Sequence, residues 1–209
     1  MKARENPFRA ERVRSLQFRP HGLGWDDLLA RLAELNHRAA FIGHEGAGKT
    51  TALEELEKRL VEKGWKTELI YLGPLPRKEI IQRLRRLAGA ADPKTIILID
   101  SAEKIPKLVW GLVTRLYRNA GGLVITAHNP GRLPTLYRCA TSESLLDELL
   151  VELVPYPAPA LRQEAKEKFN QLSGNIRHVF WKLYDLWPGI QLNGADPKDV
   201  NENGLDAPH

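Results

Sequence analysis

Hydrophobic positions in the first two thirds of the chain follow two alternating periods. Short apolar runs bounded by Gly, Pro or Asp predict buried strands, and leucines spaced three or four residues apart predict amphipathic helices between them. The predicted strands are 38–43, 66–72, 95–100 and 123–126, with a short fifth at 135–139. The predicted helices are 25–35, 50–63, 77–87 and 104–119. Because strands and helices alternate, the pattern predicts βαβ units that form a parallel sheet with helices on both faces.

The pattern changes after residue 141. Three helices without an intervening strand are predicted at 142–154, 160–172 and 175–186. The chain is therefore divided into a basic N-terminal arm (1–22), expected to be an extended arm or an entry loop, a core (23–141), a small helical lid subdomain (142–187) and a tail (188–209). Gly, Asn, Asp and Pro dominate the tail, so we expect it to be disordered.

Composition narrows the class of protein. Hydrophobic residues make up 43% of the 209 positions and charged residues 27%, a balance that excludes a wholly disordered chain. The one cysteine, Cys139, excludes an intramolecular disulfide and a zinc site with several thiolates. The first residues lack a secretory signal, and no apolar run approaches the ~18 residues that span a bilayer. We expect a soluble, cytoplasmic protein without membrane insertion.

Positive charge is unevenly distributed along a chain of net charge +5. Residues 1–20 hold six basic residues and two glutamates, and the predicted helix 77–87 places positions 78, 82, 85 and 86 on one side, with only Gln82 neutral. Such stripes are either solvated faces or contacts for nucleic acid or an anionic membrane surface. Both interpretations stay open.

A glycine-rich segment between a predicted strand and a predicted helix fits the pattern G-x-x-x-x-G-K-[ST]. It consists of Gly43, His44, Glu45, Gly46, Ala47, Gly48, Lys49, Thr50 and Thr51. Glycines let backbone N–H groups wrap a polyphosphate, and the helix that follows directs its N-terminal dipole at the phosphates. Lys49 is placed to reach the β- and γ-phosphates, and the Thr50 hydroxyl to complete a Mg²⁺ shell. The segment predicts a nucleotide-binding loop.

Polar residues end two of the predicted strands. Asp100 closes the apolar run 95–100, and a carboxylate there would hold Mg²⁺ together with Thr50. Glu103 either polarises the attacking water or stabilises the dipole of the helix predicted after it. Thr126 and His128 end the fourth strand, where either side chain would hydrogen-bond the γ-phosphate or the water.

The loop 43–51 is a Walker A motif, and the strand 95–100, which ends in Asp100, has the form of a Walker B motif. Together with the distal helices, these motifs resemble the AAA+ class of P-loop ATPases, broadly the ExeA and origin-recognition types. The resemblance implies a three-layer α/β/α fold with a five-stranded parallel sheet in the order 5-1-4-3-2. It also implies ATP bound with Mg²⁺ between core and lid, and homo-oligomers. The segment 173–177 resembles the sensor-2 element, so Arg177 inherits a γ-phosphate contact. Residues 6–8 resemble an arm near the adenine.

Two features depart from the family pattern. Ser101 stands where these ATPases usually have Glu, and three arginines are equal candidates for an arginine finger: Arg118, Arg132 and Arg138. We expect an ATP-binding protein and Mg²⁺-dependent ATPase that acts as a switch on a macromolecular client, such as a protein. The alternatives are a nucleic-acid-associated ATPase of the loader or transposition type and a small-molecule P-loop kinase. The kinase is disfavoured because one plain helix separates strands three and four.

Overall fold

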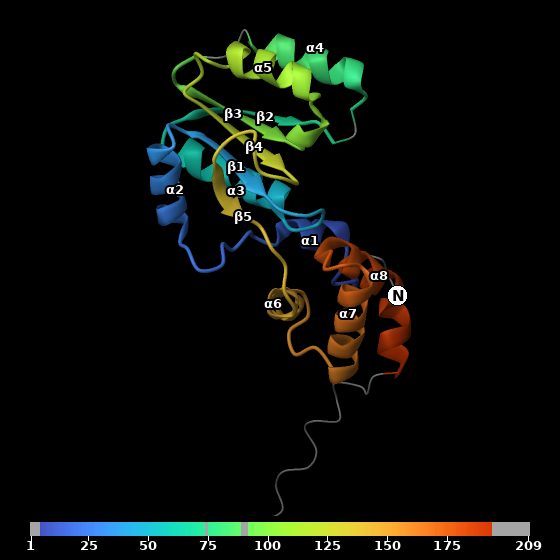
Figure 1. Cartoon of the computed structure of the whole chain (residues 1–209). Helices are drawn as coiled ribbons and strands as arrows, with labels where there is room; N and C mark the ends of the chain where they lie inside the picture. Colours follow the sequence, from blue (N-terminus) through green and yellow to red (C-terminus); the bar gives the residue numbers. More distant parts are fainter. Residues whose placement is uncertain (1–4, 74, 89–91, 194–209) are drawn as a thin grey trace, which may run out of the picture. The chain divides into compact units, whose positions relative to one another are not determined.

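The computed structural model describes residues 5–73, 75–88 and 92–193, and the chain divides into two compact units (Figure 1). The core unit runs from Gln17 to Ala140. The helical unit combines the residues up to Leu16 with those from Thr141 onward. The candidate chemistry, with the exception of Arg177, lies in the core unit.

A five-stranded sheet forms the centre of the core unit. Its strands are β1 (Arg38–Ile42), β2 (Lys66–Tyr71), β3 (Thr95–Asp100), β4 (Gly122–Ala127) and β5 (Thr135–Arg138). They pair in parallel in the order β2-β3-β4-β1-β5, which confirms the predicted order. Every residue of β3 and β4 is buried, because strands with helices on both faces have no polar side. Parallel pairing brings the carboxyl ends of β1, β3 and β4 to one edge.

Two helices cover each face of this sheet, which confirms the three-layer α/β/α architecture (Figure 1). On one face lie α2 (Trp25–Glu34) and α3 (Lys49–Glu62), which bury leucines such as Leu28 and Leu56 against Phe41 and Leu98. On the other face lie α4 (Arg77–Ala88) and α5 (Lys107–Leu116), which pack against another set of strand residues.

The helix predicted over 104–119 is shorter than expected. A 3₁₀ turn, η2 (Ala102–Lys104), follows β3, and α5 begins only at Lys107, after Pro106 as its N-cap. Proline lacks the backbone N–H of a helix interior and is tolerated at a helix start, so the chain leaves the turn at Pro106 and begins a new helix there.

The described part of the helical unit contains four α-helices: α1 (Ala10–Ser15), α6 (Glu143–Leu153), α7 (Pro159–Gln171) and α8 (Ile176–Asn193). Residues 1–22 were expected to form an extended arm or an entry loop, but Ala10–Ser15 of this segment form the helix α1. Phe8 and Leu16, on either side of α1, are buried in the apolar cluster of this unit, and the Phe8 ring stacks on Phe180 at a centroid distance of 5.8 Å. Burial of these two side chains fixes the intervening segment in place, so it folds rather than staying extended.

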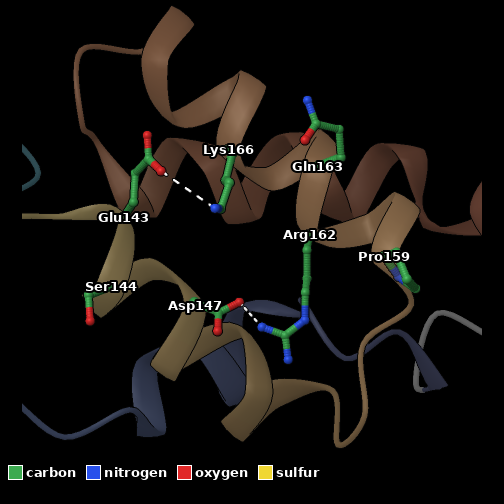
Figure 2. Close-up of a pocket in the computed structure, with 7 residues that line it drawn as sticks. All are labelled: Glu143, Ser144, Asp147, Pro159, Arg162, Gln163 and Lys166. Atoms are coloured by element: carbon green, nitrogen blue, oxygen red, sulfur yellow. Dashed lines mark hydrogen bonds and ion pairs between the residues drawn. The ribbon is translucent and has the colours of Figure 1, made fainter.

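The other helices of the unit were predicted, but α8 continues through Pro188 to Asn193, past the predicted end at 186. The rest of the expected tail, 194–209, lies outside the described residues. Figure 2 shows Arg162 and Lys166 of α7 paired with Asp147 and Glu143 of α6. These pairs are half-exposed, so each contributes about 0–1 kcal/mol and apolar packing holds the unit together. Within the described part of the chain, no helix has the length and apolar character needed to span a membrane.

Candidate nucleotide-binding site

The predicted phosphate-binding loop occupies the carboxyl edge of the sheet, between β1 and α3. Gly46 and Gly48 have φ of 78° and 81°, and Gly48 is the N-cap of α3. This left-handed conformation strains residues with a Cβ, so glycine permits the turn that leads into the helix. His44 and Glu45 are exposed at the tip, while Ala47 is buried and Thr51 lies in the first turn of α3. The amides at the start of α3 thus open onto the loop.

Gly43 lies against a residue that the sequence motif does not include. A Cβ built on Gly43 would be 2.4 Å from the carbonyl oxygen of Cys139, the residue that follows β5. The Cys139 amide also donates to the carbonyl of Ile42 at 2.7 Å. Burial raises the pKa of the Cys139 thiol to about 12, so this side chain is a neutral part of the wall behind the loop.

The Lys49 ammonium is turned back onto the loop. Its Nζ donates to the carbonyl oxygen of His44 at 2.7 Å, and the residue is only 8% exposed. Burial lowers the pKa of Lys49, and nearby negative charges oppose that shift, with Glu103 the strongest among them. The Lys49 ammonium has lost much of its hydration, and its hydrogen bond is to a neutral carbonyl. An anion bound at the loop would therefore stabilise this charge.

Three hydroxyl groups converge on Asp100. Its Oδ1 accepts from Thr50 at 3.0 Å and from Thr126 at 2.8 Å, and its Oδ2 accepts from Ser101 at 3.2 Å. Ser101 has a left-handed φ of 63°, which turns its own N–H toward the Thr126 hydroxyl at 2.7 Å. Carboxylate and hydroxyl oxygens are the ligands that Mg²⁺ prefers, and Asp100 and Thr50 stand side by side. The residues at this point fit the metal that the sequence predicts.

Thr126 is fully buried, and its hydroxyl is used inside the protein. It donates to Asp100 and accepts from the Ser101 amide, so in this arrangement it orients the carboxylate. The predicted contact with a γ-phosphate or water stays a prediction. The sequence placed this threonine at the right edge of the sheet but gave no sign of its partner.

Glu103 lies in η2, not in a long helix. Helix α5 starts four residues after Glu103, so the carboxylate precedes the first turn, where a helix dipole acts most strongly. Its Oε1 lies 3.5 Å from Nε2 of His128, which follows β4. Its Oε2 is buried and has no hydrogen-bond partner within the described residues. Glu103 and His128 therefore face each other at the edge of the sheet where β3 ends in Asp100.

Arg132, one of the three arginine-finger candidates, is held within the core unit. Its guanidinium donates to the carbonyl of Ile105 and lies 4.9 Å from the ring centroid of Trp110. Burial lowers its pKa, and the negative charge of Glu103 opposes this shift. The guanidinium and the carboxylate are thus electrostatic neighbours. Arg118 and Arg138 are exposed.

An aromatic residue that was not predicted also borders the loop. A Cβ on Gly48 would be 3.5 Å from the ring of Phe18, in ordinary van der Waals contact. Phe18 makes edge contacts with Trp25 and Tyr137, at centroid distances of 6.0 and 5.8 Å. Phe18 carries no motif, so only the folded chain reveals its position.

Arg177 belongs to the helical unit. It lies in the first turn of α8 and its side chain is exposed, next to Asn175, whose side chain caps the helix by accepting from the amide of His178 at 3.2 Å. Its γ-phosphate contact stays a prediction, as does the placement of residues 6–8 near an adenine. Phe8 itself is part of the apolar cluster of the helical unit.

Solved structures with the same arrangement of elements support the fold. A RuvB mutant from Thermotoga maritima matches with a TM-score of 0.54 and 12% identity, over 83% of this chain and 65% of that chain. The replication initiator DnaA bound to AMPPCP and single-stranded DNA matches with a TM-score of 0.54 and 12% identity, over 80% and 62%. A DNA replication initiation factor matches with a TM-score of 0.55 and 13% identity, over 81% and 60%.

These neighbours are AAA+ ATPases. The chain therefore has the fold of the AAA+ class of P-loop ATPases, as the sequence motifs suggested. The match spans slightly less than two thirds of the length of each neighbour, and at this identity the likeness is one of fold. No protein-family model and no curated protein sequence matches the chain.

Proposed function

We propose that the core unit binds Mg·ATP at the loop 43–51 and that the chain is a Mg²⁺-dependent ATPase acting as a nucleotide-controlled switch. The observation that carries the proposal is the meeting of three groups at one edge of the sheet. The ammonium of Lys49, which is largely desolvated, the N-terminus of α3 and the carboxylate–hydroxyl pair of Asp100 and Thr50 together provide for the charges of a triphosphate.

Each part of the site has a defined task in this proposal. The N–H groups of the loop and of the first turn of α3 donate hydrogen bonds to the phosphate oxygens, and Lys49 exchanges the His44 carbonyl for a phosphate. Thr50 and Asp100 would hold the metal ion, which when bound offsets the negative charge on the phosphates. ATP is favoured over GTP because the sequence lacks a guanine-reading Asn-Lys-x-Asp segment. The adenine nucleotide analogue in the DnaA structure also supports this choice.

Hydrolysis requires a group that accepts a proton from the attacking water. Glu103 is our candidate because its Oε2 has no hydrogen-bond partner within the described chain and its Oε1 is near His128. Ser101, which stands where related ATPases usually have Glu, hydrogen-bonds to Asp100 and does not supply a base. The acid in this chain is thus displaced by one 3₁₀ turn from its usual place. The γ-phosphate contact of Arg177, in the helical unit, stays a prediction from the family resemblance.

The test is the affinity for a fluorescent ATP analogue with Mg²⁺, measured for the wild type, Lys49→Ala and Lys58→Ala. Lys58 is the matched control because it lies on the same helix, is exposed and, in the described part of the chain, forms an ion pair only with Glu55, at 3.3 Å. Loss of a charge-assisted hydrogen bond costs about 1.5–3 kcal/mol, so Lys49→Ala should bind at least ~10-fold more weakly. Equal affinity for Lys49→Ala and Lys58→Ala would refute the proposal.

A further inference from the structure

The two helix layers of the core unit differ in charge. Helices α4 and α5 together contain seven basic residues and one acidic residue. Helices α2 and α3 contain four basic and seven acidic residues. Because α4 and α5 pack on one face of the sheet and α2 and α3 on the other, positive charge collects on one side of the core unit (Figure 1).

The basic side chains of α4 and α5 face the solvent. Helix α4 buries Ile80 and Leu84, and α5 buries Val113. Six exposed basic residues remain on their outer sides, which we call the α4/α5 basic face: Lys78, Arg83, Arg85, Arg86, Lys107 and Arg115. None of them takes part in an ion pair recorded among the described residues. On α3, by contrast, Lys58 and Arg59 both pair with Glu55.

The two helices form one continuous surface. The hydroxyl of Tyr117, the C-cap of α5, donates to the carbonyl oxygen of Leu84 in α4 at 2.8 Å. Both helices also contribute to the same apolar cluster. Buried packing therefore fixes the two helix backbones that carry these charges, so a polyanionic partner can contact both helices without rearranging them.

We propose that the α4/α5 basic face binds the phosphate backbone of duplex nucleic acid without sequence preference. Four of its six residues are arginines, whose planar guanidinium matches a phosphate with two parallel hydrogen bonds. Single strands are bound mainly by stacking bases on exposed aromatic rings. Helix α4 contains no aromatic residue, and Trp110, the one in α5, is half-buried beside Arg132. The α4/α5 basic face therefore has the positive charge that binds phosphates but, among its described residues, no exposed aromatic ring on which bases could stack, which favours a duplex over a single strand.

A protein partner is the competing occupant. Leu108 and Leu112 of α5 are 98% and 41% exposed, and would serve as apolar anchors for an acidic protein. The duplex is favoured because the exposed side of α4 has only polar and charged side chains in its described positions. Duplex nucleic acid would then be the client that the proposed function leaves open. Binding of the duplex itself does not depend on the proposed function, whereas its control by a nucleotide does.

The experiment measures binding of the full chain to a fluorescent 20-bp DNA duplex at several salt concentrations. The test variant is Arg83→Gln/Arg85→Gln/Arg86→Gln. The control, Lys58→Gln/Lys63→Gln/Lys66→Gln, removes the same charge from exposed positions outside the face. Each lost phosphate contact lowers the slope of log affinity against log salt by about 0.9. We expect the test variant to reduce the slope by roughly 2–3 and the affinity at least tenfold. The control should change the slope by less than about one.

Several outcomes would overturn the inference. The first is that the chain does not bind the duplex in a salt-dependent way, and the second is that the control variant loses as much affinity for the duplex as the arginine variant. The others are that the chain binds a single strand more tightly than the duplex, or that poly-glutamate of equal total charge displaces the duplex. A larger loss from Leu108→Ala/Leu112→Ala than from the arginine variant would assign the surface to a protein. Nucleotide affinity separates the two proposals: the arginine variant should bind ATP like the wild type, which also shows that it folds. Lys49→Ala should still bind the duplex.

Discussion

Replacing Thr126 by valine removes a hydroxyl and keeps the size and β-branching of the side chain. The residue is fully buried on β4, so no solvent can replace what is lost. Two hydrogen bonds disappear: the one donated to Asp100 Oδ1 at 2.8 Å and the one accepted from the Ser101 amide at 2.7 Å. The second leaves a backbone N–H without its partner in a residue of left-handed conformation.

The magnitude follows from the two bonds. A hydrogen bond to a charged group contributes about 1.5–3 kcal/mol and a neutral one about 1 kcal/mol, so Thr126→Val should lower the free energy of unfolding by roughly 2.5–4 kcal/mol. The control is Thr114→Val on α5, whose hydroxyl only donates to the carbonyl of Gly111 in its own helix. A change of within about 0.5 kcal/mol is expected there.

Function should change in step with stability. Residues that orient a metal ligand typically alter metal affinity 10–100-fold when they are lost, so the Mg²⁺ concentration that supports half-maximal nucleotide binding should rise about tenfold in Thr126→Val. Urea unfolding and a Mg²⁺ titration at fixed ATP measure the two effects. If Thr126→Val matched Thr114→Val in both, the hydroxyl network around Asp100 would not have the role assigned to it.

Two further substitutions test the loop and the proposed base. Gly43→Ala places a Cβ 2.4 Å from the carbonyl oxygen of Cys139, and should cost about 1–3 kcal/mol in the free energy of unfolding and abolish nucleotide binding. In the control, Gly111→Ala, the new Cβ lies in open space on a helix, and the free energy of unfolding should rise by about 1 kcal/mol. If both substitutions changed the free energy of unfolding equally, the contact between Gly43 and Cys139 would not have the importance assigned to it. Glu103→Gln should keep ATP affinity and lower turnover by about 10²–10⁴. Exposed Glu79→Gln is the control, and unchanged turnover in Glu103→Gln would assign water activation to another group.

Local signals in the sequence predicted most of the strands and helices of the core unit. The all-apolar run of β3 and the alternation of strands and helices indicated a parallel sheet, and the AAA+ resemblance implied its order. The loop 43–51 could be identified because its glycines, Lys49 and Thr50 are adjacent in sequence. The late start of α5 was also readable, since Pro106 lies inside the segment predicted as one helix.

Contacts between distant residues were not predictable. The hydroxyl of Thr126 meets Asp100 only after β3 and β4 pair, and Cys139 reaches Gly43 only through β5 beside β1. The six-residue helix α1 has no buried residue of its own. Phe8, outside the helix, is buried by residues from the other end of the chain, such as Phe180. These features depend on tertiary packing, which a local pattern does not record.

The most direct test of the account is a crystal structure of the chain with Mg²⁺ and a non-hydrolysable ATP analogue at saturating concentration. The account predicts the triphosphate within the loop 43–51, with Lys49 moved from the His44 carbonyl onto a phosphate and Mg²⁺ beside Thr50 and Asp100. An empty loop in such a crystal, with the Lys49–His44 hydrogen bond intact, would contradict it.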